Sequence, residues 1–429
     1  MKKISINQAV NTLLELGDKG ENITLLGIGP MSYRLIEASL ELAKEKNFPP
    51  MFIASRNQVD ATEMGGGYVC NWNQKEFVEA IKEVAAKVDY QGEYYICRDH
   101  GGPWQRDKER DTHIEEDEAM RLGKLSYKYD MENGFDLLHI DPTKDPYVVG
   151  KVIPLDIVIK RTVELIEYCE EERKKLKISE LAYEVGTEET NGGLTSIETY
   201  EDFIIQLKDE LEKRKLPTPT FIVGQTGTLV RKTENVGSFN FGNASDLAKV
   251  ARRFSVGLKE HNGDYISDKT MLKHSPARIT ATNVAPQYGT EETRAYLELA
   301  ELEQDLKDEG LVANTSSIKE TLLLHAIKSE RWRKWMVGDQ TDLTVNEVLA
   351  SESLSEEILD IAGHYTFNNP EVKKEIECLF TNLSSNGIEG NRFVINRIKR
   401  SLNQYVEGFN LEGSLTKIKK QIESKAVYS

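Results

Sequence analysis

The chain has 429 residues, which is long for one compact domain and suits a barrel of about 250–300 residues with an addition. Hydrophobic residues make up 39% and charged residues 29% of the sequence, so there is enough apolar material for a large core. The formal net charge of -16 argues against nucleic acid and anionic membranes as partners, because an acidic surface is repelled by both.

The cysteines and the N-terminus indicate a cytoplasmic protein. The four cysteines are scattered and form no C-x-x-C pair, so the sequence predicts neither a disulfide framework nor a zinc finger; they are Cys70, Cys97, Cys169 and Cys378. No apolar stretch follows the N-terminal lysines, and no apolar run reaches the roughly 20 residues of a membrane helix. We therefore expect a reducing cytoplasm and no membrane span.

Short β-rich runs alternate with longer helical patterns through the first three quarters of the chain. Strands are expected at Ile23–Gly29, Met51–Ser55, Tyr94–Asp99, Phe135–Asp141, Glu180–Gly186, Thr220–Gln225, Val256–His261 and Arg278–Asn283. Helices are expected between them at Tyr33–Lys46, Lys75–Val88, His113–Tyr129, Leu155–Lys175, Thr199–Arg214 and Asp246–Phe254. This alternation predicts a parallel sheet with right-handed crossovers, and eight such units close into a (β/α)8 TIM barrel.

Polar and Gly-rich residues follow each expected strand, as in Asp99-His100-Gly101-Gly102 and His261-Asn262-Gly263-Asp264. In a barrel all strand carboxyl ends share one face, which carries the active site. A doubly wound open sheet is the competing interpretation, and fewer of these clusters would converge in it. The sequence contains neither G-x-G-x-x-G nor a P-loop motif.

After Glu309 the strand patterns stop. Helices are expected at Ile318–Met336, Thr344–Ala350, Ser355–Gly363, Glu371–Leu383, Arg392–Tyr405 and Leu415–Lys425. We therefore divide the chain into a barrel over residues 1–309, which carries the site, and a helical C-terminal extension over residues 310–429.

Two histidines stand at expected strand ends. Asp99 and His100 end the third strand, where Asp99 could act as an acid/base and His100 as a metal ligand; the alternative is a surface loop in which Asp99 caps the next helix. His261 ends the seventh strand, and Asp264 could be a second acid/base; the alternative is a solvated Asn-Gly turn. His139 is expected to be a packed core histidine.

The fifth and sixth strands end in further candidate ligands. Glu184 lies within a strand and is followed by Glu188 and Glu189, and a carboxylate inside a barrel needs a partner such as a metal ion. The alternative is an outward-pointing Glu184 that pairs with a lysine. Gln225 follows an apolar strand, and it is either a fourth ligand or a turn residue.

The eighth unit contains Arg278 and Asn283, and in barrels the loops after strands seven and eight commonly bind phosphate. These two residues are therefore candidates for substrate binding.

Together these motifs resemble the family of the non-catalytic subunit of class II D-tagatose-1,6-bisphosphate aldolase, which includes related ketose-phosphate epimerases. The matching runs are Ser55-Arg56-Asn57-Gln58-Val59, Gly65-Gly66-Gly67-Tyr68, Asp99-His100-Gly101-Gly102-Pro103, His139-Ile140-Asp141, Val185-Gly186-Thr187-Glu188 and Asp264-Tyr265 after His261. The resemblance covers most of the chain and implies substrate-binding roles for Ser55, Asn57, Gln58 and Asp141. Glu184 departs from the family, which usually has an apolar residue there, and it resembles the metal-binding glutamate of catalytic class II aldolases.

The leading hypothesis is a metal-dependent ketose or ketose-phosphate epimerase acting at C4, or a class II aldolase-type lyase. A divalent ion would be held by His100, Glu184 and His261, with Gln225 as a fourth candidate; Zn2+ is favoured, and Mn2+ or Mg2+ are alternatives. Asp99, Asp264 and Glu188 are the candidate acid/base residues. The alternative is a non-catalytic subunit that stabilises a separate catalytic aldolase chain. The expected partners are a ketose or ketose phosphate, that catalytic chain, or a second copy in a homo-oligomer.

Overall fold

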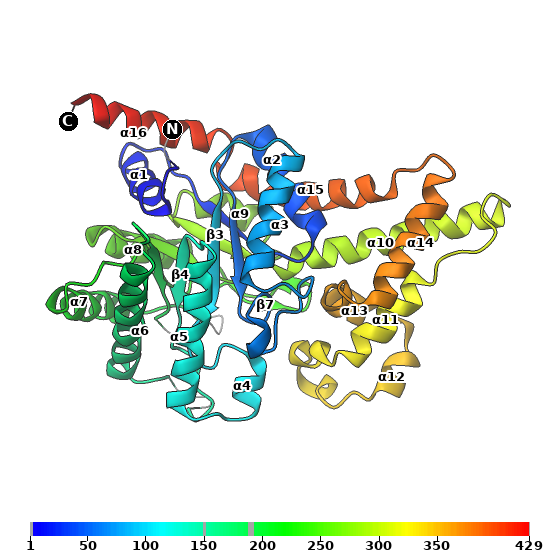
Figure 1. Ribbon diagram of the computed structural model, residues 1–429, viewed down its shortest axis with the longest axis horizontal. Helices are drawn as coiled ribbons and strands as arrows, with labels where there is room; N and C mark the ends of the chain where they lie inside the picture. The colour runs from blue at the N-terminus through cyan, green and yellow to red at the C-terminus, as the bar shows by residue number, and fades with distance from the viewer. Residues whose placement is uncertain (1–2, 149–151, 188–192, 429) are drawn as a thin grey trace.

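The computed structural model describes residues 3–148, 152–187 and 193–428. Eight parallel strands form a closed barrel in the order β1-β10-β9-β6-β5-β4-β3-β2 (Figure 1). They are β1 (Leu25–Ile28), β2 (Met51–Ser55), β3 (Tyr95–Gly101), β4 (Leu137–Ile140), β5 (Ala182–Val185), β6 (Phe221–Val223), β9 (Gly257–Glu260) and β10 (Ala281–Val284). The predicted (β/α)8 barrel is therefore confirmed.

Helices surround the barrel and cover the outer faces of its strands. They are α2 (Tyr33–Lys46), α3 (Gln74–Lys87), α5 (Glu116–Glu132), α6 (Leu155–Lys175), α7 (Ile197–Lys213), α8 (Phe241–Arg253), α9 (Asp268–His274) and α10 (Pro286–Asp308). α4 (Asp107–Asp111) is a short helix in the loop between β3 and α5. Each strand is buried along almost its whole length, as expected for parallel strands covered on both faces. Short additions are α1 (Ile6–Asp18), η1 (Thr62–Met64) and a hairpin of β7 (Val230–Arg231) and β8 (Glu234–Asn235).

Local sequence explains where these helices begin. Asn73 precedes α3 and forms a capping box, in which its side chain accepts the N–H of Glu76 and the Glu76 side chain accepts the N–H of Asn73. Phe77, Ile81 and Val84 then recur at helical spacing and are buried against the barrel.

The described residues beyond Glu309 contain helices and no strand. They form α11 (Ile318–Lys328), η2 (Arg331–Trp335), η3 (Gly338–Gln340), α12 (Val345–Leu349), α13 (Glu352–Ala362), η4 (Gly363–Thr366), α14 (Pro370–Ser384), α15 (Gly390–Gly408) and α16 (Ser414–Tyr428). α10 projects from the barrel, and α11 and α14 pack against α10 (Figure 1). α15 then returns to pack on α2, and α16 lies beside α1. The predicted helical extension is present, and the division at Glu309 into two domains stays a prediction.

One predicted helix, Ile318–Met336, is broken in the structure. α11 ends at Lys328, and Glu330 takes a left-handed conformation with φ of 53° before η2 begins. Trp332 and Met336 then join a small apolar core of their own with Ile358 and Tyr365, separate from the barrel core. Within the described residues, no helix is both long enough and apolar enough to cross a membrane.

Candidate metal centre

Asp99, His100, His139 and His261 bring four potential ligand atoms within 4.8 Å of one another. They come from β3, from β4 and from the residue after β9, so they meet at the carboxyl ends of the strands. His100 Nε2 and His261 Nδ1 are 3.1 Å apart. Two nitrogens bound to one tetrahedral zinc ion at about 2.0–2.1 Å are separated by about 3.3 Å. The residues therefore fit a small divalent ion.

A backbone irregularity lets two consecutive residues serve one site. Neighbouring side chains on a regular strand point to opposite faces. His100 instead has φ of 43°, in the left-handed region, and the pairing of β3 with β4 shifts register between Arg98 and Gly101. Such a bulge re-aims side chains, and strained backbone of this kind is typical of functional sites. Asp99 and His100 consequently both belong to the cluster.

Two of the histidines are backed by buried carboxylates. His100 Nδ1 lies 2.6 Å from Asp141 Oδ2, and His261 Nε2 lies 2.7 Å from Glu184 Oε1. A carboxylate behind a histidine fixes the orientation of the ring and raises its basicity, which is the usual arrangement behind metal-bound histidines.

His139 was expected to be a core histidine; it is buried, as expected, and it also belongs to the cluster. Its Nδ1 accepts a hydrogen bond from the backbone N–H of His100 at 3.1 Å. Its Nε2 is buried and has no hydrogen-bond partner among the described residues. A buried polar atom without a partner requires an explanation, and an absent ligand is one.

Glu184 contacts two residues inside the barrel, Lys259 and His261. Its side chain is fully buried and forms an ion pair with Lys259 of β9, in addition to its contact with His261. Burial opposes ionisation of this carboxyl, but Lys259 above all holds its pKa at about 2. Glu184 thus lies behind His261 and outside the group of four potential ligands, where the sequence hypothesis had placed it among them.

Asp99 is also ionised in this environment. Although burial opposes ionisation, His100 above all holds the pKa of Asp99 well below its usual range. Asn283 Nδ2 donates a hydrogen bond to Asp99 Oδ1 at 3.1 Å. Asp99 is therefore a carboxylate that can accept hydrogen bonds or bind a cation.

A cavity of about 190 Å³ opens on this cluster, and Asp264, Asn283 and Trp335 line it together with Asp99, His100 and His261. Asp264 Oδ1 accepts the backbone N–H groups of Ala285 at 3.0 Å and Gln287 at 2.8 Å. Despite these hydrogen bonds, burial raises the pKa of Asp264 to about 7. A carboxyl group with such a pKa can both accept and donate a proton near neutral pH.

Three predicted substrate-binding residues lie at the end of β2 and make contacts within the protein. The backbone N–H of Ser55 donates to Gln58 Oε1 at 2.8 Å, and Asn57 Nδ2 donates to Asp107 Oδ1 at 3.1 Å. None of the three is among the described residues that line the cavity. Of the other predicted substrate-binding residues, Asn283 lines the cavity and Asp141 lies behind His100.

Arg278 lies at the opposite end of the barrel. β10 begins at Ala281, three residues later than the predicted strand, so Arg278 precedes the strand. Its guanidinium contacts the carbonyl of Gly17 and lies 3.4 Å from Asp18, both in α1. Arg278 therefore holds α1 and is remote from the cluster.

Gln225 and Glu188 are the remaining candidates. Gln225 follows β6 and exchanges hydrogen bonds with Thr195 through its backbone, at 2.7 and 3.0 Å, and it is not among the described residues that line the cavity. Glu188 lies outside the described residues.

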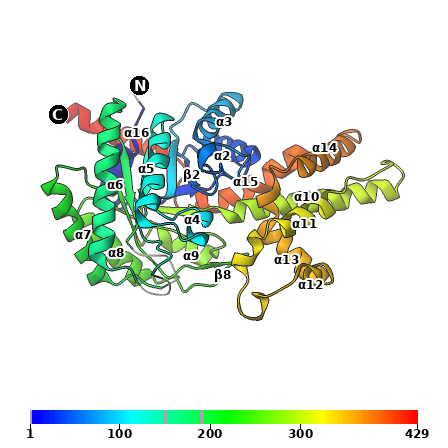
Figure 2. The ribbon, with the colours of Figure 1, turned by 60° about the horizontal axis from the view of Figure 1, so that its bottom comes forward.

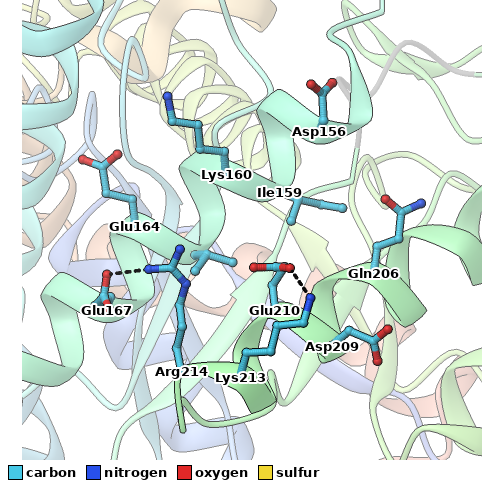
Figure 3. Close-up of a pocket in the computed structure, with 11 residues that line it drawn as sticks. Asp156, Ile159, Lys160, Glu164, Glu167, Gln206, Asp209, Glu210, Lys213 and Arg214 are labelled. Carbon is cyan, nitrogen blue, oxygen red and sulfur yellow. Dashed lines mark hydrogen bonds and ion pairs between the residues drawn. The ribbon is translucent and has the colours of Figure 1, made fainter.

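A larger groove of about 500 Å³ lies on the outer surface between α6 and α7 (Figure 3). Its charges are mixed and partly paired with each other, as in Arg214 with Glu167 at 3.2 Å and Lys213 with Glu210 at 2.7 Å. Among the described residues, the group of metal-ligating side chains lies at the barrel mouth and not in this groove. The potential metal-ligating side chains therefore lie at the smaller cavity.

The sequence profile of the family described as D-tagatose-1,6-bisphosphate aldolase subunit GatZ/KbaZ-like matches residues 10–423. A comparison with curated proteins finds no match.

Solved structures share the fold at low sequence identity. A probable tagatose 6 phosphate kinase from Sinorhizobium meliloti 1021 is 16% identical with a TM-score of 0.73, over 90% of this chain and 100% of that one. The fructuronate-tagaturonate epimerase UxaE from Cohnella laeviribosi is 11% identical with a TM-score of 0.56, over 91% and 82%. The fructose-bisphosphate aldolase from Campylobacter jejuni is 12% identical with a TM-score of 0.51, over 96% of each chain. These likenesses establish the barrel fold.

Proposed function

Because this chain belongs to the D-tagatose-1,6-bisphosphate aldolase subunit GatZ/KbaZ-like family, as its motifs predicted, we propose that it is a metal-dependent enzyme acting on a ketose or ketose phosphate. The reaction is epimerisation at C4 or an aldolase-type cleavage. The observation that carries this proposal is the cluster of three histidines and Asp99 beside the titratable Asp264 in one cavity.

Asp99, His100, His139 and His261 would hold the divalent ion. Zn2+ is favoured because imidazole nitrogens dominate this set, and Mn2+ or Mg2+ are alternatives. When bound, the ion would supply Lewis-acid polarisation of a substrate oxygen. Asp141 and Glu184 would orient the two histidines that they contact.

Asp264 is the residue that we propose to move the proton. Its pKa of about 7 lets one carboxyl oxygen take a proton from the sugar and return it at neutral pH. Asp99 has a pKa far below neutral, so it stays ionised and serves as a ligand or as a hydrogen-bond acceptor for a sugar hydroxyl. This division of roles differs from the sequence-based hypothesis, in which Asp99 and Asp264 both act as acid/base residues with Glu188 as a further candidate.

A second candidate function is a non-catalytic subunit that stabilises a separate aldolase chain. The description of the family as an aldolase subunit favours it. A catalytic aldolase chain would then be the partner, and the cavity would bind a ligand without turning it over.

The test combines metal analysis with turnover assays on the purified full chain. Ketoses and ketose phosphates are assayed with and without added divalent ions, for the wild type and His139→Ala. We expect about one ion per chain and metal-dependent turnover in the wild type. His139→Ala should lose at least about tenfold in metal affinity, because even indirect partners of a metal contribute this much.

The matched control is His113→Ala, since His113 is exposed and lies outside the cluster. It should retain both metal and activity. A wild-type chain that binds no divalent ion would contradict the metal centre. Binding without turnover, together with activation of a class II aldolase chain, would favour the subunit.

A further inference from the structure

The cavity above the metal centre is completed by the C-terminal extension. Trp335, the last residue of η2, lines it, and the other described lining residues belong to the barrel and its loops. The site thus includes Trp335, which lies about seventy residues beyond His261 in the sequence. Trp335 reaches the cavity because the chain changes direction after α11 ends.

Two sets of contacts join the extension to the loops at the barrel mouth, one at Arg331 in η2 and the other at η3 and α13. The Arg331 guanidinium lies over the rings of Tyr68 and Tyr365, 4.6 and 5.2 Å from their centroids. On the other side, Lys232 in the turn of the β7–β8 hairpin donates to Gln340 Oε1 at 2.6 Å and to Glu357 Oε1 at 2.7 Å. Figure 2 shows this hairpin beside the extension.

These contacts position Trp335 before any ligand arrives. Trp332 lies one turn earlier and is fully buried in the apolar core of the extension, so it anchors η2 to that core. A side chain held in place in advance binds a ligand with less loss of conformational entropy.

The indole of Trp335 differs from two other tryptophans in its hydrogen bonding. Trp104 Nε1 donates to the carbonyl of Ile114 at 2.8 Å, and Trp332 Nε1 donates to that of Ile327 at 3.2 Å. Trp335 Nε1 is buried and has no acceptor among the described residues. A buried indole N–H normally finds an acceptor, and it can only donate.

The cavity combines groups that match a carbohydrate. Asp99, Asp264 and Asn283 can exchange hydrogen bonds with hydroxyls, while Ile53, Val230 and Trp335 supply apolar surface. A ketose presents both kinds of surface, because its hydroxyls alternate with C–H groups that pack on an aromatic face.

We propose that Trp335 is a substrate-binding residue of this site. Its ring packs against the C–H face of the ketose, and its Nε1–H donates to a sugar oxygen once the ligand fills the cavity. This inference rests on the proposed function in one respect, namely that the ligand is a ketose or its phosphate. It adds that the helical extension supplies part of the binding site.

The test measures binding separately from catalysis. The zinc-loaded full chain is titrated calorimetrically with D-tagatose 1,6-bisphosphate and with D-tagatose, for the wild type, Trp335→Ala and Trp335→Phe. Kinetics on the same probes give kcat and KM. Val337→Ala is the matched control, because Val337 follows on the same segment, is 48% exposed and does not line the cavity.

We expect Trp335→Ala to weaken binding at least about tenfold and to raise KM more than it lowers kcat. Trp335→Phe keeps an aromatic face and loses the N–H, so its affinity should fall by only about two- to tenfold. Zinc content and melting temperature should match those of the wild type in Trp335→Phe, which keeps the test valid if the alanine variant folds poorly.

The outcomes separate this inference from the proposed function. Turnover in the wild type with unchanged dissociation constants in both Trp335 variants would overturn the role of Trp335 alone. Binding without turnover, weakened by Trp335→Ala, would support the role of Trp335 and overturn the enzymatic function. A zinc-loaded wild type that binds neither probe would overturn both.

Discussion

Replacing Lys259 by methionine tests the ion pair inside the barrel. The side chains of Lys259 and Glu184 are 1% and 0% exposed, so Lys259→Met leaves the Glu184 carboxylate buried without its cation. Breaking a buried pair in this way costs about 3–5 kcal/mol. Spread over a chain of 429 residues, this loss lowers the melting temperature by about 3–6 °C.

The same substitution should weaken the metal centre. Lys259 is the main group that lowers the pKa of Glu184 to about 2, so this pKa should rise when the ammonium is lost. Glu184 would then be protonated over more of the pH range and would orient His261 less well. Loss of such an indirect partner typically reduces metal affinity by about 10–100-fold.

Calorimetry of unfolding and zinc titration measure the two effects. Lys259→Met with Glu184→Gln removes both buried charges, so it should recover most of the lost stability without restoring full zinc affinity. Lys213→Met is the matched control, because Lys213 pairs with Glu210 at 2.7 Å but is 67% exposed, and its loss should cost less than about 1 kcal/mol. Equal stability of the single and double variants would refute the reasoning.

Two further predictions concern pH. Asp264→Asn should lower kcat by about 10²–10⁴-fold and remove the inflection near pH 7 from the rate profile, since the pKa of Asp264 is about 7; a profile that keeps this inflection would assign it to another group. His364 is buried, and burial, together with Lys334 and Arg331, lowers its pKa to about 3, while the unfolded value is about 6.5. Between pH 6.5 and pH 3 the unfolded chain binds a proton at His364 and the folded chain does not. The free energy of unfolding therefore falls as the pH is lowered below about 6.5, by up to about 1.4 kcal/mol per pH unit. Urea titrations from pH 6.5 to 4.5 should show a shallower loss in His364→Phe, and equal slopes in both proteins would count against this account.

The barrel was predictable because its signals are local. Strands such as Met51–Ser55 are continuous apolar runs between turn residues, and helices such as Tyr33–Lys46 have an apolar face at helical spacing. The rule that sites lie at strand carboxyl ends then located Asp99, His100 and His261.

The roles of His139 and Glu184 depended on register, which the sequence does not specify. The two residues are direct partners across β4 and β5, so their side chains point to the same side of the sheet. His139 alone, in an apolar strand, is typical of a core histidine. Glu184 was expected to lie inside the barrel. If the register of the two strands had been known, that expectation would have identified His139 as its neighbour at the site.

Two boundaries also escaped prediction. Arg278 was expected to begin a strand that in fact starts three residues later, and in either case it lies at the amino end of the barrel, away from the site. The helix expected over Ile318–Met336 breaks at Glu330, where neither glycine nor proline marks the left-handed turn. The break is stabilised by the packing of Trp332 into the core of the extension, and a contact of this kind cannot be read from the local sequence.

The composition of the barrel interior bears on the choice between enzyme and stabilising subunit. A barrel whose only task is to support a partner gains nothing from buried ionic groups, because well-packed apolar residues of similar volume are often more stable by about 1–4 kcal/mol. This barrel nevertheless buries Asp99, Glu184 and Lys259 beside three histidines. At the same site, His139 Nε2 in the barrel and Trp335 Nε1 in the extension have no hydrogen-bond partner among the described residues. At this site a metal ion and a sugar would recover, on binding, the free energy that these buried groups cost. That pattern favours a working binding site, and Asp264, with its pKa of about 7, is the residue that we propose for proton transfer.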